Sequence, residues 1–448
     1  MLHRATHPDR AGRWRRPAAG LVATLFVAVP ALGLTACAPQ VVFTVGSTAD
    51  AVDAGPGDGR CATTADECTL RAAVQEANQT AAPVKIVLAP GATYTLAISG
   101  TGEDAAATGD LDIARTVSIE GNGATIDAAG IDRAVDVVGT GHLTMWRTSV
   151  TGGSAPSGGG VRVGSGAWAE LHQTWVTANT STGFLTCGGG DFLPAQCSHD
   201  EQGGGGISST GNLSLDSSTV SDNVAGPGAT GCTTELVWIG LHQFAVTTCR
   251  LTVGGGIDAR GTVAIVNSTI SGNRAGVGTG SVAAPSGIGG GLFVGGTDAP
   301  RAIVGFTTIA GNTADSGAAL FGSVTIGGSI LAAPVTPTMP ACVLGTFDLL
   351  DATSAPVSRD HNLISDGSCG LAGPHDLAST GPQLGPLGAN GGSTHTVVPA
   401  ATSPAVDAIP AGTPSLCDGS ITLDQRGFGR PTGSGCDIGA VERRPIDP

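Results

Sequence analysis

Aromatic and charged residues are scarce in this chain. Aromatic residues make up 4% of the 448 residues, with a single tyrosine, and charged residues make up 13%. Lys85 is the only lysine, and the formal net charge is −15. An acidic chain of this kind disfavours nucleic acid and anionic lipid as partners. Hydrophobic residues still reach 41%, which is enough for a core, so the composition excludes a disordered protein.

Glycine is abundant, but it follows no strict three-residue period. The 72 glycines therefore do not indicate collagen. Small residues together with many Val, Ile, Thr and Ser suit short strands and tight turns. The leucine scaffold of leucine-rich repeats and the helix pairs of ankyrin or TPR repeats are both missing from the pattern. We expect an all-β protein.

The N-terminal stretch has the pattern of an export signal. Five arginines lie between residues 4 and 16, an apolar run covers 18–34, and "LTAC" follows at 34–37. This ending is similar to a bacterial lipobox, in which the cysteine is acylated and becomes the mature N-terminus. We expect a signal peptide over 1–36, lipidation at Cys37 and a tether over 37–42, with the protein lipid-anchored outside the bacterial cell membrane. A plain secretory peptide, with release of the protein, is the alternative.

Removing that stretch changes both the charge and the cysteine count. Without residues 1–36, which carry five arginines and one aspartate, the net charge becomes −19. Eleven cysteines become ten once Cys37 is set aside, an even number that suits an oxidising compartment. Connectivity does not follow from sequence, and pairing of neighbours is the most economical choice. The neighbours are Cys61 and Cys68, Cys187 and Cys197, Cys232 and Cys249, Cys342 and Cys369, and Cys417 and Cys436.

A short unit recurs through the middle of the chain, as in "GGGIDARGTVAIVNSTISGN" (254–273). No Gly-Lys-Ser/Thr follows the glycines and no long helix pattern opens after them, which excludes a phosphate-binding loop. A unit of about 20 to 25 residues cannot bury its own core and must stack on its neighbours. The glycine triplets begin at Gly158, Gly204, Gly254 and Gly289, and the Asn-ended stretches are "TWVTAN" (174–179), "STVSDN" (218–223), "STISGN" (268–273) and "TTIAGN" (307–312).

Aligning the units places apolar residues in columns with strand-like alternation. We expect two inward columns, an Asn column in left-handed conformation at a turn, and glycines at turns that need positive φ. This pattern predicts a parallel β-helix over 106–375, with insertions at 180–203, 224–253 and 274–288 that line one edge. The inward columns are Met145, Leu171, Leu215, Ile265 and Val304, and Val150, Val176, Val220, Ile270 and Ile309.

Two terminal stretches carry a family resemblance. "FTVGSTADAVDAGPGDGRCATTADECTLRAAVQEANQ" (43–79) resembles the CSLREA domain of bacterial secreted proteins. "GPQLGPLGANGGSTHTVVPAATSPAVDAI", "DQRGFGRP" and "CDIGAVE" (381–442) are similar to the choice-of-anchor Q region. With the repeats between them, the chain resembles right-handed parallel β-helices of the pectin-lyase-like and polymorphic outer-membrane-protein kinds. The resemblance implies a right-handed solenoid.

A solenoid exposes apolar residues at both ends, so both terminal regions are expected to act as caps. We expect residues 43–105 to form the N-terminal cap, with a helix from Leu70 to about Asn78 that Thr69 caps and that covers the first coil. We expect residues 376–448 to close the far end. Asp50, Asp53 and Asp58 surround a glycine turn and form a weak Ca²⁺ candidate, with ordinary turn chemistry as the alternative.

Catalytic patterns are weak. Asp110 and Asp112 are the best carboxylate pair, but a turn or capping role is the better interpretation; Asp216 and Asp258 stand alone. Each of the histidines His172, His242 and His395 is expected to be solvated. We therefore expect no enzymatic activity and no cofactor, and a structural or adhesive protein that binds a polysaccharide or a cell-surface protein. A polysaccharide lyase or glycoside hydrolase is the alternative.

Three tryptophans give the clearest binding candidate. Trp146, Trp168 and Trp175 lie on two neighbouring coils at outward positions. Exposed tryptophans on a flat sheet can stack on sugar rings. The alternative is that the inserted loops cover them and form a small satellite core.

Overall fold

The computed structural model describes residues 40–190, 193–197, 203–226, 231–239, 242–276, 287–295, 302–334, 339–343 and 356–447. The expected signal peptide and Cys37 lie outside these residues. Contacts within the chain define one compact unit over Gln40–Pro448. Among the described residues, no helix is both long and apolar enough to cross a membrane.

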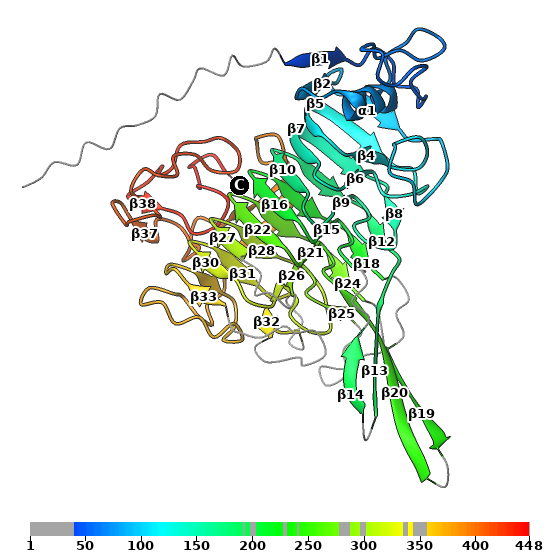
Figure 1. The fold of residues 1–448 in the computed structure, drawn as a ribbon. Helices are drawn as coiled ribbons and strands as arrows, with labels where there is room; N and C mark the ends of the chain where they lie inside the picture. Colours follow the sequence, from blue (N-terminus) through cyan, green and yellow to red (C-terminus); the bar gives the residue numbers. More distant parts are fainter. Residues whose placement is uncertain are drawn as a thin grey trace, which may run out of the picture. The chain divides into compact units, whose positions relative to one another are not determined.

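The fold is nearly all β and is dominated by long parallel sheets (Figure 1). The largest sheet has 17 strands, in which each strand pairs in parallel with the equivalent strand of the next coil. The strands are β1 (Val41–Thr44), β2 (Val84–Val87), β3 (Thr93–Thr95), β5 (Thr116–Asp127), β7 (His142–Thr151), β10 (Trp168–His172), β11 (Trp175–Thr177), β16 (Asn212–Asp216), β17 (Thr219–Ser221), β22 (Thr262–Val266), β23 (Thr269–Ser271), β27 (Ala302–Gly305), β28 (Thr308–Ala310), β30 (Thr325–Gly327), β31 (Ile330–Ala332), β33 (Val357–Ser358) and β34 (Leu363–Ile364).

Two further parallel sheets complete the solenoid. One has eight strands: β4 (Leu111–Ile113), β6 (Val135–Val137), β9 (Val161–Val163), β15 (Ile207–Ser209), β21 (Ile257–Ala259), β26 (Leu292–Val294), β29 (Leu320–Phe321) and β32 (Cys342–Val343). The other has four strands: β8 (Ser154–Ala155), β12 (Thr180–Ser181), β18 (Val224–Ala225) and β24 (Arg274–Ala275). An all-β parallel solenoid is therefore confirmed.

The two inward columns are confirmed residue by residue. Leu171 pairs in register with Met145 and Leu215, and Val176 pairs with Val150 and Val220. The same register continues to the last predicted members of both columns, and every member is buried. Burial of these aliphatic side chains supplies the main stabilisation, at roughly 25 cal/mol per Å² of apolar surface.

The asparagine column forms a ladder inside the turn. The Asn179 N–H donates to Asn223 Oδ1 at 3.0 Å, and Asn223 and Asn273 continue the pattern to Asn312 at 3.1 and 2.9 Å. The expected left-handed conformation, however, lies on the residue before each asparagine, including Ala178 (φ 54°). The asparagine itself must keep its side chain inward to reach the next coil, so the preceding residue makes the bend.

The glycine triplets occupy tight turns as predicted. The first glycine of each triplet has positive φ, between 56° and 66°. At Gly254, a Cβ would lie 2.4 Å from the carbonyl oxygen of Ile257, so no other residue fits without movement of the backbone.

Helix α1 (Leu70–Gln79) begins at Thr69, whose Oγ1 accepts the Ala72 N–H at 3.1 Å. The predicted apolar side, Leu70, Ala73, Val74 and Ala77, is buried. Arg71 was not singled out from the sequence, although its side chain is fully buried. It pairs with Asp50 at 2.6 Å and donates to three backbone carbonyls of residues 106–110. These bonds join the helix to the segment that leads into β4.

The insertions at 180–203 and 224–253 contain strands, which corrects the expectation of loops. They begin with strands of the four-stranded sheet and then form an antiparallel sheet, whose strands run beside one another in Figure 1. The strands are β13 (Leu185–Gly190), β14 (Leu193–Cys197), β19 (Gly231–Ile239) and β20 (His242–Val253), and β25 (Gly287–Ile288) of the third insertion pairs with β20.

Three of the five expected disulfides are present: Cys61–Cys68, Cys342–Cys369 and Cys417–Cys436. The other four cysteines lie on β13, β14, β19 and β20, and their side chains fall outside the described part of the chain. Backbone register places Cys187 opposite both Cys197 and Cys249, and Cys232 opposite Cys249. This backbone register fits either neighbour pairing or a bridge between Cys187 and Cys249.

The C-terminal segment, residues 381–447, contains β35 (Leu384–Gly388), β36 (Thr396–Pro399), β37 (Ile409–Pro410) and β38 (Gly435–Cys436). We expected it to close the far end, but much of it lies against the outer face of the 17-stranded sheet. Gln425 Nε2 donates to Thr219 Oγ1 at 2.8 Å, Gln425 Oε1 accepts from Thr269 at 2.6 Å, and the Ala440 N–H donates to Thr308 Oγ1 at 3.1 Å. A second buried cluster fills this interface, including Phe306, Ile330, Leu363, Ile409 and Leu416.

Candidate functional site

Two of the three predicted tryptophans are exposed on the outer face of the large sheet. Trp146 on β7 is 37% exposed and Trp168 on β10 is 43% exposed. Because Trp168 pairs with His142, four residues before Trp146, the two Cα atoms are ~14 Å apart at a rise of about 3.3 Å per residue and a strand spacing of about 4.8 Å. Two aromatic rings at this separation can contact two parts of one extended ligand.

Trp175 does not belong to this exposed pair. Its ring lies 4.2 Å from the His395 ring of the C-terminal segment, and its Nε1–H donates to Ser221 Oγ at 2.8 Å. The C-terminal segment, rather than an inserted loop, covers it. Trp175 is therefore partly covered, but not by the inserted loops that the alternative named.

Polar side chains surround the exposed tryptophans. Glu170 lies between two histidines: its Oε1 is 3.3 Å from His142 Nε2, and its Oε2 is 3.6 Å from His172 Nε2. His172 also stacks on Trp146, with ring centroids 4.0 Å apart, and its Nδ1 lies 3.4 Å from Asp216 Oδ2. We name this set of residues the aromatic platform: His142, Trp146, Trp168, Glu170, His172 and Asp216.

The strand geometry explains why these side chains meet. Alternate residues of a strand face the same side, so positions 168, 170 and 172 of β10 all point outward, and in-register pairing places neighbouring strands' residues beside them. The sequence analysis found the tryptophans but expected His172 to be solvated and Asp216 to stand alone, and it did not single out Glu170 or His142. One signal was available in the sequence: Trp146, His172 and Asp216 occupy the same column of the aligned units, which predicts that they are neighbours on adjacent strands.

Several other sequence candidates have structural partners. Asp258 pairs with Arg260 at 3.1 Å, and the His395 ring contacts Trp175. His242 lies on β20, and its side chain is outside the described residues.

The three aspartates of the Ca²⁺ candidate do not share a site. Asp50 pairs with Arg71, Asp53 accepts the Gly55 and Ala62 N–H groups, and Asp58 accepts the Arg60 N–H. Each carboxylate thus has its own turn or helix partner. This arrangement favours turn chemistry over Ca²⁺ binding.

Asp110 and Asp112 form a buried cluster with Asp136 near the first coils. Burial, reinforced by the Asp112 charge, raises the pKa of Asp110 to about 8 against the opposing charge of Arg133, and burial raises the pKa of Asp112 to about 7. Arg133 lies 3.3 Å from Asp110 and 2.8 Å from Asp136. Buried carboxylates that already face an arginine are poorly placed for contact with an external polymer.

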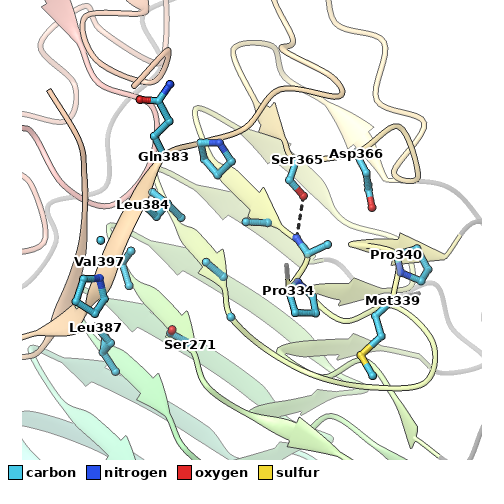
Figure 2. A pocket seen from close by; sticks show the side chains of 17 residues that line it. Ser271, Pro334, Met339, Pro340, Ser365, Asp366, Gln383, Leu384, Leu387 and Val397 are labelled. Carbon is cyan, nitrogen blue, oxygen red and sulfur yellow. Dashed lines mark hydrogen bonds between the residues drawn. The ribbon is translucent and has the colours of Figure 1, made fainter. Parts of the chain in front are cut away.

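A groove of about 950 Å³ lies between the large sheet and the C-terminal segment (Figure 2). Ser271 and Ala310 form part of its floor, and Leu384, Leu387 and Val397 line one wall. Among its described lining residues Asp366 alone is titratable, and both of its carboxylate oxygens already accept hydrogen bonds, from Ser368 and from the Ala341 N–H. This described lining therefore offers apolar contact but no free reactive group.

The aromatic platform is the better candidate site, because it combines exposed rings with two carboxylates and two imidazoles. A comparison of the chain with protein-family models, curated proteins and solved structures finds no match.

Proposed function

We propose that the protein is a non-catalytic carbohydrate-binding or adhesive solenoid that contacts a polysaccharide through the aromatic platform. The observation that carries this proposal is the pair of tryptophans, 37% and 43% exposed, on adjacent strands of a flat parallel sheet. Large exposed aromatic surface is uncommon without a ligand, and tryptophan stacks on the apolar faces of sugar rings. Glu170 and Asp216 add hydrogen-bond acceptors for sugar hydroxyl groups.

We also propose that the protein is exported and held at the bacterial surface by a lipid on Cys37. The arginine-rich start, the apolar run and "LTAC" support export and lipidation. Three disulfides agree with an oxidising compartment.

We further propose a right-handed solenoid of the CSLREA and choice-of-anchor Q kind, with α1 covering the first coil. The motifs quoted for the resemblance supply buried contacts: Arg71 of "CTLRAA" fastens α1, and Gln425 of "DQRGFGRP" joins the C-terminal segment to the sheet.

Binding is tested with a glycan array and then calorimetry on the compact unit, residues 40–448. Trp168→Ala and Trp146→Ala should each weaken binding at least tenfold while leaving the circular dichroism spectrum unchanged. Trp175→Phe is the matched control and should bind like the wild type, because Trp175 is covered. Equal affinity in all four proteins would reject the aromatic platform.

A second candidate is a polysaccharide lyase or hydrolase. His172 contacts both Glu170 and Asp216, and two carboxylates near an imidazole are groups that acid–base cleavage can use. A reducing-end assay on every polymer that binds separates the two candidates. Turnover that Glu170→Gln abolishes would replace the binding proposal with the enzymatic one.

A further inference from the structure

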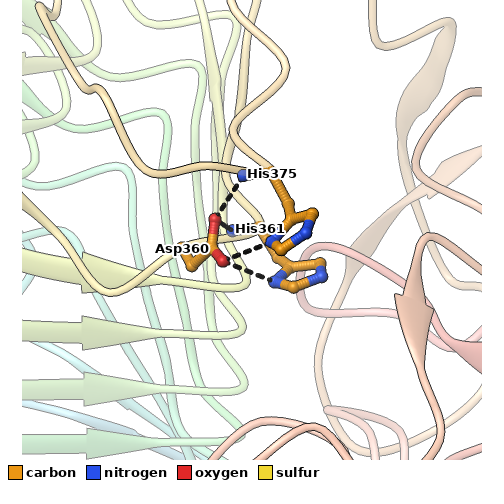
Figure 3. Close-up of side chains that lie close together, drawn as sticks. All are labelled: Asp360, His361 and His375. Carbon is orange, nitrogen blue, oxygen red and sulfur yellow. Dashed lines mark hydrogen bonds and ion pairs between the residues drawn. The ribbon is translucent and has the colours of Figure 1, made fainter.

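A second cluster of chemistry-bearing side chains lies at the far coils, away from the aromatic platform. Asp360 and His361 follow β33, and His375 lies in the stretch after β34. Figure 3 shows both imidazole rings beside the Asp360 carboxylate. One ligand atom from each residue lies within 4.8 Å of those of the other two.

Backbone bonds hold the Asp360 carboxylate in one orientation. Its Oδ1 accepts the N–H groups of His361 at 3.0 Å and His375 at 2.7 Å. Its Oδ2 is thereby turned toward both rings, 2.6 Å from His375 Nδ1 and 3.6 Å from His361 Nδ1. The two rings lie 4.7 Å apart between centroids. One carboxylate oxygen and two imidazole nitrogens therefore converge on one point.

His361 has an unmet bonding requirement at that point. Its side chain is 5% exposed, and its buried Nδ1 has no hydrogen-bond partner among the residues that the structure describes. A buried polar atom left without a partner costs about 1–3 kcal/mol. His375, by contrast, is 63% exposed, so the cluster opens to solvent on one side.

We propose that Asp360, His361 and His375 bind a divalent transition-metal ion of the Zn²⁺ class. Imidazole nitrogen and carboxylate oxygen are ligands that Zn²⁺ takes at about 2.0–2.2 Å, and a bound ion gives the buried His361 Nδ1 its missing partner. Three protein ligands leave a fourth position for water or for an exogenous group.

The fit requires one small movement. Ligand atoms around a tetrahedral Zn²⁺ lie roughly 3.3 Å apart when the bonds are about 2.0–2.1 Å long. The 3.6 Å distance between Asp360 Oδ2 and His361 Nδ1 is close to this value, whereas the 2.6 Å distance between Asp360 Oδ2 and His375 Nδ1 must increase. His375 is the exposed member, so its ring is free to make that shift.

The test uses the full chain without a polyhistidine tag, treated with a chelator and then titrated with ZnCl₂ at pH 7.5 by calorimetry. We expect saturable binding of one ion per chain. His375→Ala and Asp360→Asn should each weaken binding more than tenfold, with unchanged circular dichroism and melting of the metal-free protein. Co²⁺ provides a second readout, since its visible absorption in a tetrahedral site should vanish in His375→Ala.

His142→Ala is the matched control, because the aromatic platform also places imidazoles beside a carboxylate. It removes an imidazole that is 38% exposed on its side chain and should leave the affinity unchanged. The proposal is overturned if no saturable binding occurs, if His375→Ala and Asp360→Asn bind like the wild type, or if His142→Ala is the variant that loses the ion.

Discussion

Stability should fall as the pH rises from 5 to 8, because of the buried carboxylates near the first coils. The pKa of Asp112 is about 7 in the folded chain, against an ordinary value of 3.8, and that of Asp110 is about 8. A carboxyl group with a raised folded-state pKa binds a proton more tightly when folded than when unfolded. Its contribution is complete below the ordinary pKa and is lost as the pH rises through the folded-state value.

Asp112→Asn isolates this effect. Asp112 Oδ2 accepts the Ala106 N–H, which an amide oxygen can also do, and Oδ1 has no hydrogen-bond partner in the described part of the chain. A shift of about three pKa units corresponds to about 4 kcal/mol, and partial screening by solvent reduces this to roughly 2 kcal/mol at pH 8. The variant should therefore exceed the wild-type free energy of unfolding by about 2 kcal/mol at pH 8 and by less than about 1 kcal/mol at pH 5, because most of the loss falls between pH 5 and the folded-state pKa of about 7.

The assay is denaturant unfolding at both pH values with disulfides intact, with hydrogen exchange of β4 and β6 to locate the change. Asp66→Asn is the control, because the Asp66 carboxylate is exposed and pairs with the exposed Arg60. Its free energy of unfolding should differ from that of the wild type by no more than about 0.5 kcal/mol at either pH. Wild-type stability that stays constant or rises from pH 5 to 8, with no gain for Asp112→Asn at pH 8, would refute the reasoning.

Three further changes test other parts of the chain. Asn273→Ala removes one step of the ladder and leaves the Asn223 N–H without its acceptor, so unfolding should become easier by about 1–3 kcal/mol in denaturant titration; an unchanged midpoint would contradict this. Gln425→Leu removes the side chain that bonds to both the Thr219 and the Thr269 hydroxyl, so proteolysis of the C-terminal segment should become faster. Cleavage at the wild-type rate would argue against a role of Gln425 in holding this segment on the sheet. Cys37→Ser should move the protein from the membrane fraction to the medium on immunoblots, and full retention would reject lipidation.

The core could be predicted because its signal is local and repeated. Val176, Val220 and Ile270 occupy one column in the sequence alignment and one column in the sheet, since each unit repeats the same pattern of inward positions although the insertions between units differ in length. The ladder of Asn223 and Asn273 followed from the same spacing. The position of the bend did not, because side-chain reach rather than residue preference decides which residue takes positive φ.

The site was only partly predictable, because its contacts cross the repeat. The exposed tryptophans could be identified from the sequence alone. The contacts of Glu170 with His142 and His172 depend on the register of neighbouring strands, which the sequence does not state. Gln425 reaches Thr219 across 206 residues, and no pattern in one sequence reports such a distance. Asp360 and His375 likewise come into contact because the chain folds back after β34, and no spacing motif in the sequence indicates this contact.

The contacts of Gln425 and Ala440 bear on how this protein can change in length. A simple solenoid tolerates the gain or loss of a coil, because each coil meets only its neighbours. Here the C-terminal segment forms hydrogen bonds with Thr219, Thr269 and Thr308, which lie on three successive coils. Duplication or deletion of a coil within that span would displace these threonine hydroxyls from their partners in the C-terminal segment. The C-terminal segment therefore fixes the number of coils between Thr219 and Thr308. It places no such constraint on the number of coils nearer the N-terminus.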